Sequence, residues 1–224
     1  MVNFFNRALS FLKMFFLSKV PRNYKRVFDD IYEQGIWNDS DKTAPLSGPG
    51  SSIENTVDVS VLLGEFIYDK NIKSIADLGC GDLTWMSRTN FFNDKDISYI
   101  GIDVAGSLIE KHKKSYENKS FFNLDITADK LPNAELFIIR DVIFHLHLER
   151  IIKLFKNIKG KWKYLAITSC LNHVNNNKFD RWHFSERNLN IHPFNIKKNY
   201  LISITEEKFN RVFFIISHDA FYNQ

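Results

Sequence analysis

Three acidic residues and one glycine turn are the groups in this chain whose types and spacing could do chemistry. Asp77 precedes the turn formed by Gly79, Cys80 and Gly81, whereas Asp103 and Asp125 each end a later apolar run. A glycine turn lets the backbone approach a ligand without a Cβ in the way. A carboxylate about twenty residues after such a turn can accept hydrogen bonds from both hydroxyls of a ribose. The spacing therefore predicts a nucleoside site.

The elements that must position these groups are the strands of an open sheet. Apolar runs predict strands at 72–78, 97–103, 120–126, 135–140 and 163–169, and a hairpin at 200–205 and 211–217. Helical patterns and their stop signals predict helices at 24–34, 53–70, 85–91, 106–116 and 148–155, with Ser51 or Ser52 capping the second of these. Because the carboxyl ends of parallel strands meet at one edge of the sheet, we expect the three acids to lie there together.

Four motifs resemble the class I S-adenosylmethionine-dependent methyltransferases. They are Asp-Leu-Gly-Cys-Gly at 77–81, Tyr-Ile-Gly-Ile-Asp at 99–103, Asn-Leu-Asp-Ile at 123–126 and Leu-Phe-Ile-Ile-Arg-Asp-Val-Ile-Phe-His-Leu at 136–146. The resemblance implies a doubly wound, Rossmann-like α/β fold. Its mostly parallel seven-stranded sheet would end in an antiparallel hairpin, with strand order 3-2-1-4-5-7-6. One departure is Leu83, which stands where the family turn often carries a third glycine. Thr84 stands where dehydrogenases carry glycine, which disfavours NAD.

The same resemblance implies the cofactor S-adenosylmethionine and a role for each residue near the turn. Asp77 would accept from the ammonium group, Asp103 would hold the ribose hydroxyls, and Asp125 would accept from the adenine amino group. Arg140 would hold the cofactor carboxylate or an anionic part of the substrate. The alternative for each acid is a helix N-cap or a solvated loop carboxylate. The other residues expected at the cofactor are Gly79, Cys80, Gly81, Val104 and Ile126.

Methyl transfer to a hydroxyl needs a base, and His145 is our candidate because an imidazole titrates near neutrality. Asp141 lies four residues earlier, so the two side chains would share one face if this segment were helical. His147 would then point elsewhere, toward the surface. The alternative is that His145 is hydrogen-bonded to a loop and stabilises the start of a helix.

The segment 44–52 has the strongest loop composition in the chain and leads into the helix before the first strand. It is either a lid over the cofactor or a simple linker. We divide the chain into an N-terminal helical and lid segment, 1–52, and a methyltransferase domain, 53–224. Residues expected at the lid or the substrate are Trp37, Ser47, Gly48, Asp82, Trp85, Arg181, His183 and Arg187. The alternative for Asp82 is a helix cap.

Composition excludes several classes of protein. The 224 residues are 44% hydrophobic and 25% charged, which is typical of one globular α/β domain. The net charge of +4 is spread along the chain, so we expect no nucleic-acid partner. Two cysteines favour free thiols and a cytoplasmic location, and no Cys/His spacing predicts a metal.

Residues 1–20 repeat apolar side chains at helical spacing and include a basic residue within the apolar run. The uncharged run is too short to cross a bilayer, and no cleavage pattern of a signal peptide is present. The alternatives are a helix packed on the domain, a homodimer contact, or a helix on the inner membrane surface.

The expected acceptor is small and polar. The pattern of Trp37, 47–52 and 187–194 resembles bacterial methyltransferases that modify surface-polysaccharide or cell-envelope sugars, as in capsule synthesis. The resemblance implies O-methylation of a sugar or nucleotide-linked sugar. The alternatives are a phosphate-type oxygen such as a phosphoramidate, an RNA or protein acceptor, and a non-catalytic scaffold. Arg140-Asp-Val-Ile replaces the Asn/Asp-Pro-Pro-Tyr stretch associated with base N-methylation.

Overall fold

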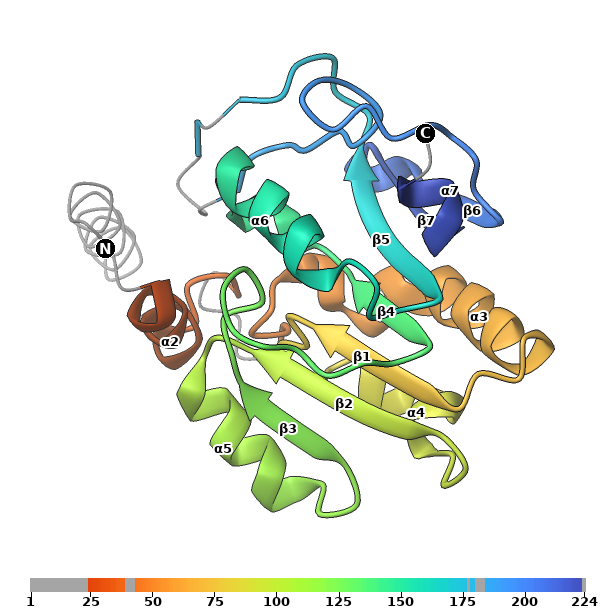
Figure 1. The fold of residues 1–224 in the computed structure, drawn as a ribbon. Helices are drawn as coiled ribbons and strands as arrows, with labels where there is room; N and C mark the ends of the chain where they lie inside the picture. Colours follow the sequence, from red (N-terminus) through yellow and green to blue (C-terminus); the bar gives the residue numbers. More distant parts are fainter. Residues whose placement is uncertain (1–23, 39–42, 177, 180–183, 223–224) are drawn as a thin grey trace, which may run out of the picture.

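A single mixed sheet organises the computed structural model, which describes residues 24–38, 43–176, 178–179 and 184–222. Its strand order is β3-β2-β1-β4-β5-β7-β6 (Figure 1). The strands are β1 (Ser74–Leu78), β2 (Ser98–Asp103), β3 (Ser120–Asn123), β4 (Leu136–Ile139), β5 (Tyr164–Cys170), β6 (Ile202–Glu206) and β7 (Arg211–Ser217). Strands β1 to β5 are parallel, and β7 runs antiparallel to both β5 and β6. The predicted fold class and strand order are confirmed.

Helices cover both faces of the sheet because its strands alternate between two apolar clusters. One face buries Ile75, Leu136 and Ile138 against α3 (Ile53–Asp69) and α4 (Asn90–Asn93). The other face buries Phe137 and Ile139 against α6 (Leu148–Ile158) and α7 (His218–Tyr222). A strand buried on both faces reads as a continuous apolar run, which is why the predicted strands were located within two or three residues of their observed ends.

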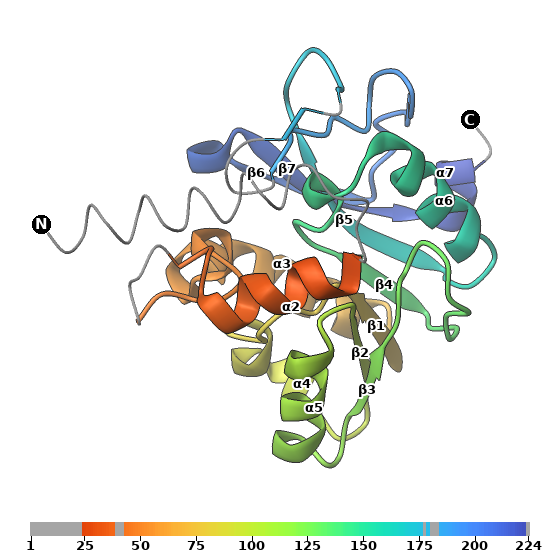
Figure 2. The same ribbon diagram turned by 90° about the vertical axis from the view of Figure 1, so that its left-hand side faces the viewer.

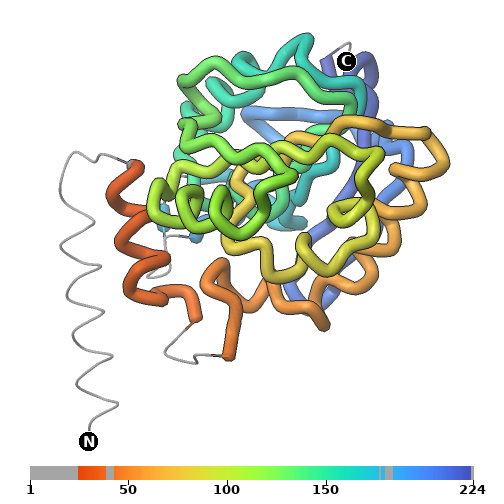
Figure 3. Tube along the Cα trace, turned by 90° about the horizontal axis from the view of Figure 1, so that it is seen from below, coloured from red at the N-terminus to blue at the C-terminus, as the bar shows by residue number. Residues whose placement is uncertain are grey.

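Helix α2 (Tyr24–Gln34) lies beside α5 (Gly106–Ser115), as Figures 2 and 3 show from two directions. A third apolar cluster joins them, with Phe28 and Ile31 of α2 packed against Leu108 of α5. Helix α2 and the 3-10 turn η1 (Pro49–Ser51) therefore stand over the carboxyl edge of the sheet. Ser52 caps α3 as predicted, since its hydroxyl accepts from the amide of Asn55 at 3.3 Å. The division of the chain after residue 52 stays a prediction.

The predicted helix at 85–91 is wrong. This crossover contains only the 3-10 turn η2 (Met86–Arg88) and the four-residue α4. Thr89 adopts an extended backbone and its hydroxyl accepts from the amide of Phe92, so it starts a new helix instead of continuing one. Leu83, at φ 59°, also holds the chain in a left-handed turn just after the glycines. Apolar spacing alone does not reveal such interruptions.

The described residues include no helix long and apolar enough to cross a membrane. Cys80 and Cys170 are both buried and unpaired. Residues 1–20, for which the sequence leaves three alternatives, lie outside the described part of the chain.

Candidate functional site

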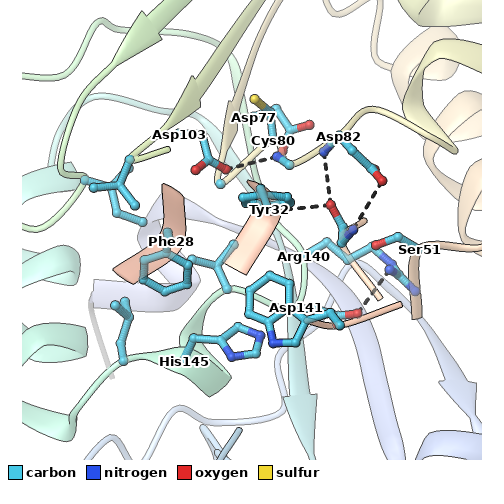
Figure 4. A pocket seen from close by; sticks show the side chains of 18 of the residues that line it. Phe28, Tyr32, Ser51, Asp77, Cys80, Asp82, Asp103, Arg140, Asp141 and His145 are labelled. Carbon is cyan, nitrogen blue, oxygen red and sulfur yellow. Dashed lines mark hydrogen bonds and ion pairs between the residues drawn. The ribbon is translucent and has the colours of Figure 1, made fainter. Parts of the chain in front are cut away.

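A pocket opens at the carboxyl edge of the sheet, where β1, β2, β3 and β4 end. Its empty space is about 930 Å³, which includes the part open to solvent. Figure 4 shows the acids of β1 and β2 at one end of the view, and Asp141 and His145 at the other. The pocket is lined by Phe28, Tyr32, Trp37, Ser47, Ser51, Asp77, Gly79, Cys80, Gly81, Asp82, Trp85, Asp103, Val104, Leu124, Asp125, Ile126, Arg140, Asp141, Val142, His145, Leu146 and Arg150.

The backbone amides of the glycine turn are hydrogen-bonded to other residues of the chain. The amides of Gly79 and Cys80 both donate to the carbonyl of Ile102, and the amide of Gly81 donates to Asp103 at 3.0 Å. A Cβ at Gly79 would lie 2.3 Å from Val142, and one at Gly81 would lie 2.4 Å from the Ser47 hydroxyl. Glycine is therefore required at both positions. The turn brings backbone to the pocket as predicted, but these three amides already have partners within the protein.

Asp103 organises the turn from the end of β2. It is 6% exposed, and its two oxygens accept from the amides of Gly81 and Ala105 at 3.0 and 2.9 Å. Burial raises the pKa of its carboxyl, although these amide hydrogen bonds act in the opposite direction. Behind the turn, the buried His112 ring lies 2.7 Å from the carbonyl of Gly81. Asp103 is thus both part of the pocket wall and a support for the turn.

Asp77 is 4% exposed and accepts a hydrogen bond from the hydroxyl of Tyr99 at 2.7 Å. Burial raises the pKa of its carboxyl to about 7, while the hydrogen bond from Tyr99 acts to lower it. In the described part of the chain, neither Asp77 nor Asp103 forms an ion pair. The pocket therefore holds two buried carboxyl groups that lack a cation in direct contact.

Asp125 lies in the pocket wall beside Ile126, but its carboxylate is already engaged. Arg150 of α6 donates to one oxygen at 2.5 Å, and the amide and hydroxyl of Thr127 donate to the other at 2.9 and 2.7 Å. Burial acts to raise the pKa of Asp125, but these hydrogen bonds outweigh it and lower the pKa below its usual value. Asp125 therefore holds its own loop and α6 through these contacts, an arrangement that neither a helix N-cap nor a solvated loop carboxylate describes.

Arg140 and Asp141 belong to a buried ring of four charges. Arg140 donates to Asp141 at 3.1 Å and to Glu206 at 2.8 Å, and Arg211 contacts the same two acids at 2.9 Å each. Arg140 also donates to the carbonyl of Gly50 at 2.8 Å, and its guanidinium lies over the ring of Trp85. Within the described residues, Oδ1 of Asp141 and Nε of Arg140 are buried without a hydrogen-bond partner. These two atoms are candidates for ligand contacts.

Asp141 and His145 do not share a helical face, because the segment between them is not an α-helix. Asp141 has a left-handed backbone, with φ 62°, and only a short 3-10 turn, η3 (Ile143–His145), follows it. His145 nevertheless lines the pocket and stacks on Trp37 with ring centroids 4.6 Å apart. Phe28 lies edge-on to the same imidazole at 6.3 Å. His147, predicted to lie on the surface, is half-buried at the start of α6.

The segment 45–52 closes one side of the pocket. The amide of Ser47 donates to Asp82 at 3.2 Å, and the amide of Asp82 donates back to the Ser47 hydroxyl at 3.0 Å. The hydroxyl of Tyr32 lies 3.3 Å from the same serine oxygen. Gly48, with φ 87°, starts η1 next to Trp37. Asp82 also accepts from the amide of Thr84 at 3.1 Å, so it holds its own turn as well as the segment that contains Ser47.

Arg187 does not line the pocket, which corrects the prediction. It is fully buried, and its guanidinium donates twice to the carbonyl of Leu146, at 3.2 and 2.8 Å. It therefore holds the chain immediately after His145. Arg181 and His183, also predicted at the substrate, lie outside the described residues.

Among the residues that the structure describes, no group of three or more His, Cys, Asp or Glu side chains could hold a metal ion.

No family model and no curated protein matches this chain. Solved structures do match. The N-methyltransferase NodS of Bradyrhizobium japonicum WM9, in complex with S-adenosylhomocysteine, is 12% identical over 83% of this chain and 95% of its own, with a TM-score of 0.58. The magnesium protoporphyrin IX methyltransferase of Synechocystis PCC 6803, with bound S-adenosylmethionine, is 10% identical over 70% of this chain and 77% of its own, with a TM-score of 0.53.

A third match is the mitomycin 7-O-methyltransferase MmcR, 10% identical with a TM-score of 0.51. It aligns with 83% of this chain, which spans 66% of its length. The chain has the class I methyltransferase fold. Because the matches transfer methyl groups to both nitrogen and oxygen, the fold alone does not indicate the acceptor atom.

Within this methyltransferase fold, sequence reasoning missed residues that reach the site from distant elements. Phe28 and Tyr32 of α2 and Arg150 of α6 line the pocket, and Glu206 and Arg211 of the hairpin form ion pairs with the pocket residues Arg140 and Asp141. The sequence predicts the helix at 24–34, but nothing in it indicates which surface this helix covers. Pairing between residues some 65 positions apart, such as Arg140 and Glu206, leaves no local signal.

Proposed function

We propose that this chain is an S-adenosylmethionine-dependent methyltransferase that methylates a small polar acceptor. The observation that carries the proposal is the pair of buried, pocket-lining carboxyl groups, Asp77 and Asp103, for which no cation in contact is found among the described residues. Buried carboxylates are costly unless a positive charge or hydrogen-bond donors compensate them. A ligand with an ammonium, a sulfonium and ribose hydroxyls would supply both. S-adenosylmethionine supplies a methyl group bonded to a sulfonium, an excellent leaving group.

The residues of the chain fit that ligand in three places. The Asp77 carboxylate would accept from the ammonium, and Asp103 would accept from the ribose while it still holds the amide of Gly81. Val104, Leu124 and Ile126 supply the apolar wall expected around an adenine. Asp125, engaged by Arg150 and Thr127, would shape this wall and is a weaker candidate for a direct contact.

We further propose that the acceptor is a hydroxyl of a sugar or nucleotide-linked sugar, as in surface-polysaccharide assembly. His145 would take the hydroxyl proton during attack, and its stacking on Trp37 fixes the plane of the imidazole. Oδ1 of Asp141 and Nε of Arg140 would orient the polar part of the acceptor. The aromatic rings of Trp37 and Phe28 offer the apolar surface on which a sugar ring can lie.

Calorimetric titration tests the cofactor. We expect the purified chain to bind S-adenosylmethionine and S-adenosylhomocysteine with micromolar affinity and NAD not at all. Asp103→Asn should weaken binding about tenfold or more, because one charge-assisted contact is lost. Asp58→Asn on the exposed face of α3 is the matched control. Wild-type protein that binds neither compound would overturn the proposal.

The acceptor is tested by the release of S-adenosylhomocysteine in the presence of sugars, nucleotide-linked sugars and phosphate-type compounds. For a hydroxyl acceptor, His145→Ala should lower kcat about 10²- to 10⁴-fold, with unchanged cofactor affinity. An ionised phosphate-type oxygen has no proton to lose, so the same variant would keep most of its rate. A rate that survives this substitution therefore argues against the hydroxyl and for the phosphate-type acceptor.

A further inference from the structure

A buried tyrosine lies directly behind the pocket. The hydroxyl of Tyr99 donates to Oδ2 of Asp77 at 2.7 Å, and the two residues are 2% and 4% exposed. Tyr99 does not line the pocket, whereas Asp77 does. A hydrogen bond between two groups removed from water is strong and well oriented. One oxygen of the carboxyl is thus engaged from inside the protein, which leaves Oδ1 for a ligand.

The register of β1 and β2 places the Tyr99 hydroxyl next to the Asp77 carboxyl. Tyr99 pairs with Ile75, and Gly101 pairs with Asp77. Tyr99 is therefore two residues before the pairing partner of Asp77, and the two side chains lie on the same face of the sheet. Gly101 has no side chain to block the path, and a Cβ there would lie 2.6 Å from the ring of Phe121. Phe92 packs edge-on against Tyr99 with centroids 4.8 Å apart. The ring is therefore fixed while its hydroxyl faces Asp77.

We infer that Tyr99 is a positioning residue for the cofactor: its hydroxyl holds Asp77 as an oriented carboxylate that receives the ammonium group of the methionine part. The inference rests on the proposed function and adds to it a residue that does not touch the ligand. No acid–base step is assigned to Tyr99, because burial raises the pKa of its hydroxyl well above the ordinary value.

The charges around Asp77 explain why this hydrogen bond matters. The pKa of Asp77 is raised to about 7 as the net result of four causes. Burial raises it most, the Tyr99 hydroxyl lowers it, the carboxyl of Asp103 raises it, and the Arg140 guanidinium lowers it. Cys80 in the turn contributes a neutral thiol, since burial raises its pKa well above the usual value. Near neutral pH the carboxyl is close to balance between its two forms. Removal of the Tyr99 hydroxyl would shift that balance toward the protonated form.

Calorimetry with two ligands tests the role of Tyr99. S-adenosylhomocysteine carries the ammonium group, whereas 5′-methylthioadenosine lacks the whole amino-acid part. We expect Tyr99→Phe to weaken binding of S-adenosylhomocysteine about tenfold near pH 7, and the loss to shrink as the pH rises to about 8.5. Affinity for methylthioadenosine should not change. Equal losses for both ligands at every pH would indicate a merely structural role and overturn the inference.

Two further variants complete the experiment. Tyr116→Phe is the matched control, because Tyr116 packs against the same Phe92 and Phe121 rings, and it should behave as wild type. Asp77→Asn keeps an acceptor for Tyr99 but cannot ionise, so its weak binding of S-adenosylhomocysteine should lose the pH dependence of the wild type over this range. If Tyr99→Phe does not fold, this second variant decides: retention of the wild-type pH dependence overturns the inference.

The possible failures can be told apart. A wild-type protein that binds neither ligand means that the proposed function fails. A wild-type protein that binds both, with Tyr99→Phe equal to it across the pH range, means that only the role of Tyr99 fails.

Discussion

At the scale of single residues, the buried carboxyl of Asp77 lowers the stability of the folded protein at neutral pH. Asp77 is buried, no cation of the described residues contacts it, and its carboxyl has a pKa of about 7 instead of 3.8. Between these values the folded protein holds a proton that the unfolded chain releases. The folded state is therefore favoured at low pH, and this contribution is lost as the pH rises through the window from about 4 to about 7. Above about pH 7, the buried ionised carboxylate destabilises the folded state, and a bound cation would offset this effect.

We expect Asp77→Asn to stabilise the protein while it weakens cofactor binding. An amide cannot ionise but can still accept the hydrogen bond from Tyr99. The gain should be on the order of 3 kcal/mol at about pH 8, and smaller near pH 5, where the wild-type carboxyl is largely protonated in the folded state. Thermal unfolding at the two pH values measures it. A gain that is equal at both would contradict the assignment of the raised pKa to Asp77.

Residue types and spacing located the acids correctly, but not their partners. Asp77, Asp103 and Asp125 were expected at the sheet edge, and all three line the pocket. That Arg150 engages Asp125 could not be predicted, because Arg150 comes from α6 and meets Asp125 only through the packing of the fold. The prediction for Arg187 was wrong: it was expected at the substrate, but its side chain is fully buried. The sequence does not reveal this, because a charged residue in a polar loop usually lies on the surface.

At the scale of elements, the segment 45–52 is tied to two different strand ends. Ser47 and Asp82 exchange hydrogen bonds above the turn that follows β1. Gly50 accepts from Arg140 at the end of β4, and a Cβ at Gly50 would lie 2.9 Å from Asp141. The segment therefore spans the pocket from the cofactor end to the expected acceptor end, which favours the lid alternative over a simple linker.

We expect Ser47→Ala to loosen this lid. The substitution removes the acceptor for the amide of Asp82 and the partner of Tyr32. One such hydrogen bond corresponds to a change of roughly 2- to 10-fold in affinity. The loss should lie mainly in a faster dissociation of S-adenosylhomocysteine, measured by stopped-flow displacement. Ser60→Ala on α3 provides the control, and an unchanged dissociation rate would show that the contact with Asp82 does not hold the ligand in.

The ring of four charges connects the antiparallel hairpin to the site. Glu206 and Arg211 are paired in register across β6 and β7. Glu206 forms an ion pair with Arg140, and Arg211 forms one with Asp141. The arginines have 4% and 6% of their side-chain surface exposed, so the ring is almost dry. A buried ion pair adds little net stability, but loss of one member leaves its partners uncompensated.

We therefore expect Arg211→Met to destabilise the protein by about 3–5 kcal/mol, measured by chemical denaturation. The loss would come from Asp141 and Glu206, which would retain buried charge with fewer donors. Lys113→Met, in the exposed pair with Glu110 on α5, is the matched control and should change nothing measurable. Equal stability of the Arg211 variant and the wild type would mean that water or a rearranged Arg140 replaces the lost donor.

Most of the elements could be predicted, because the strands of a doubly wound sheet are buried on both faces and therefore have continuous apolar sequences. The exception at 85–91 shows the limit of that argument. Met86, Phe91 and Phe92 are all buried, yet Thr89 interrupts the segment, and their burial comes from packing on α3 and Tyr99 rather than from one helical face. The short crossover leaves the pocket without a long helix after its glycine turn.

At the scale of the whole molecule, the pocket lies where the three apolar clusters come together. Among the residues that line the pocket, Ile126 belongs to the cluster on the α6 face, Cys80 and Trp85 belong to that on the α3 face, and Phe28 belongs to the one between α2 and α5. A ligand that fills this junction contacts all three clusters at once. Unfolding of any one of them would destroy the site, so the bound ligand opposes unfolding of the entire domain.

This arrangement predicts a large thermal shift. At a concentration of about 100 times its Kd, a ligand that binds only the folded state stabilises it by about 2.7 kcal/mol. For a chain of this length each kcal/mol raises Tm by roughly 2–4 °C, so S-adenosylhomocysteine should raise Tm by about 5–10 °C, whereas NAD should not. The unfolding transition should also stay single, because lid, turn and sheet share the site. A second transition that appears only with ligand would show that α2 and the lid unfold independently of the sheet, and that the pocket is not a junction of the whole fold.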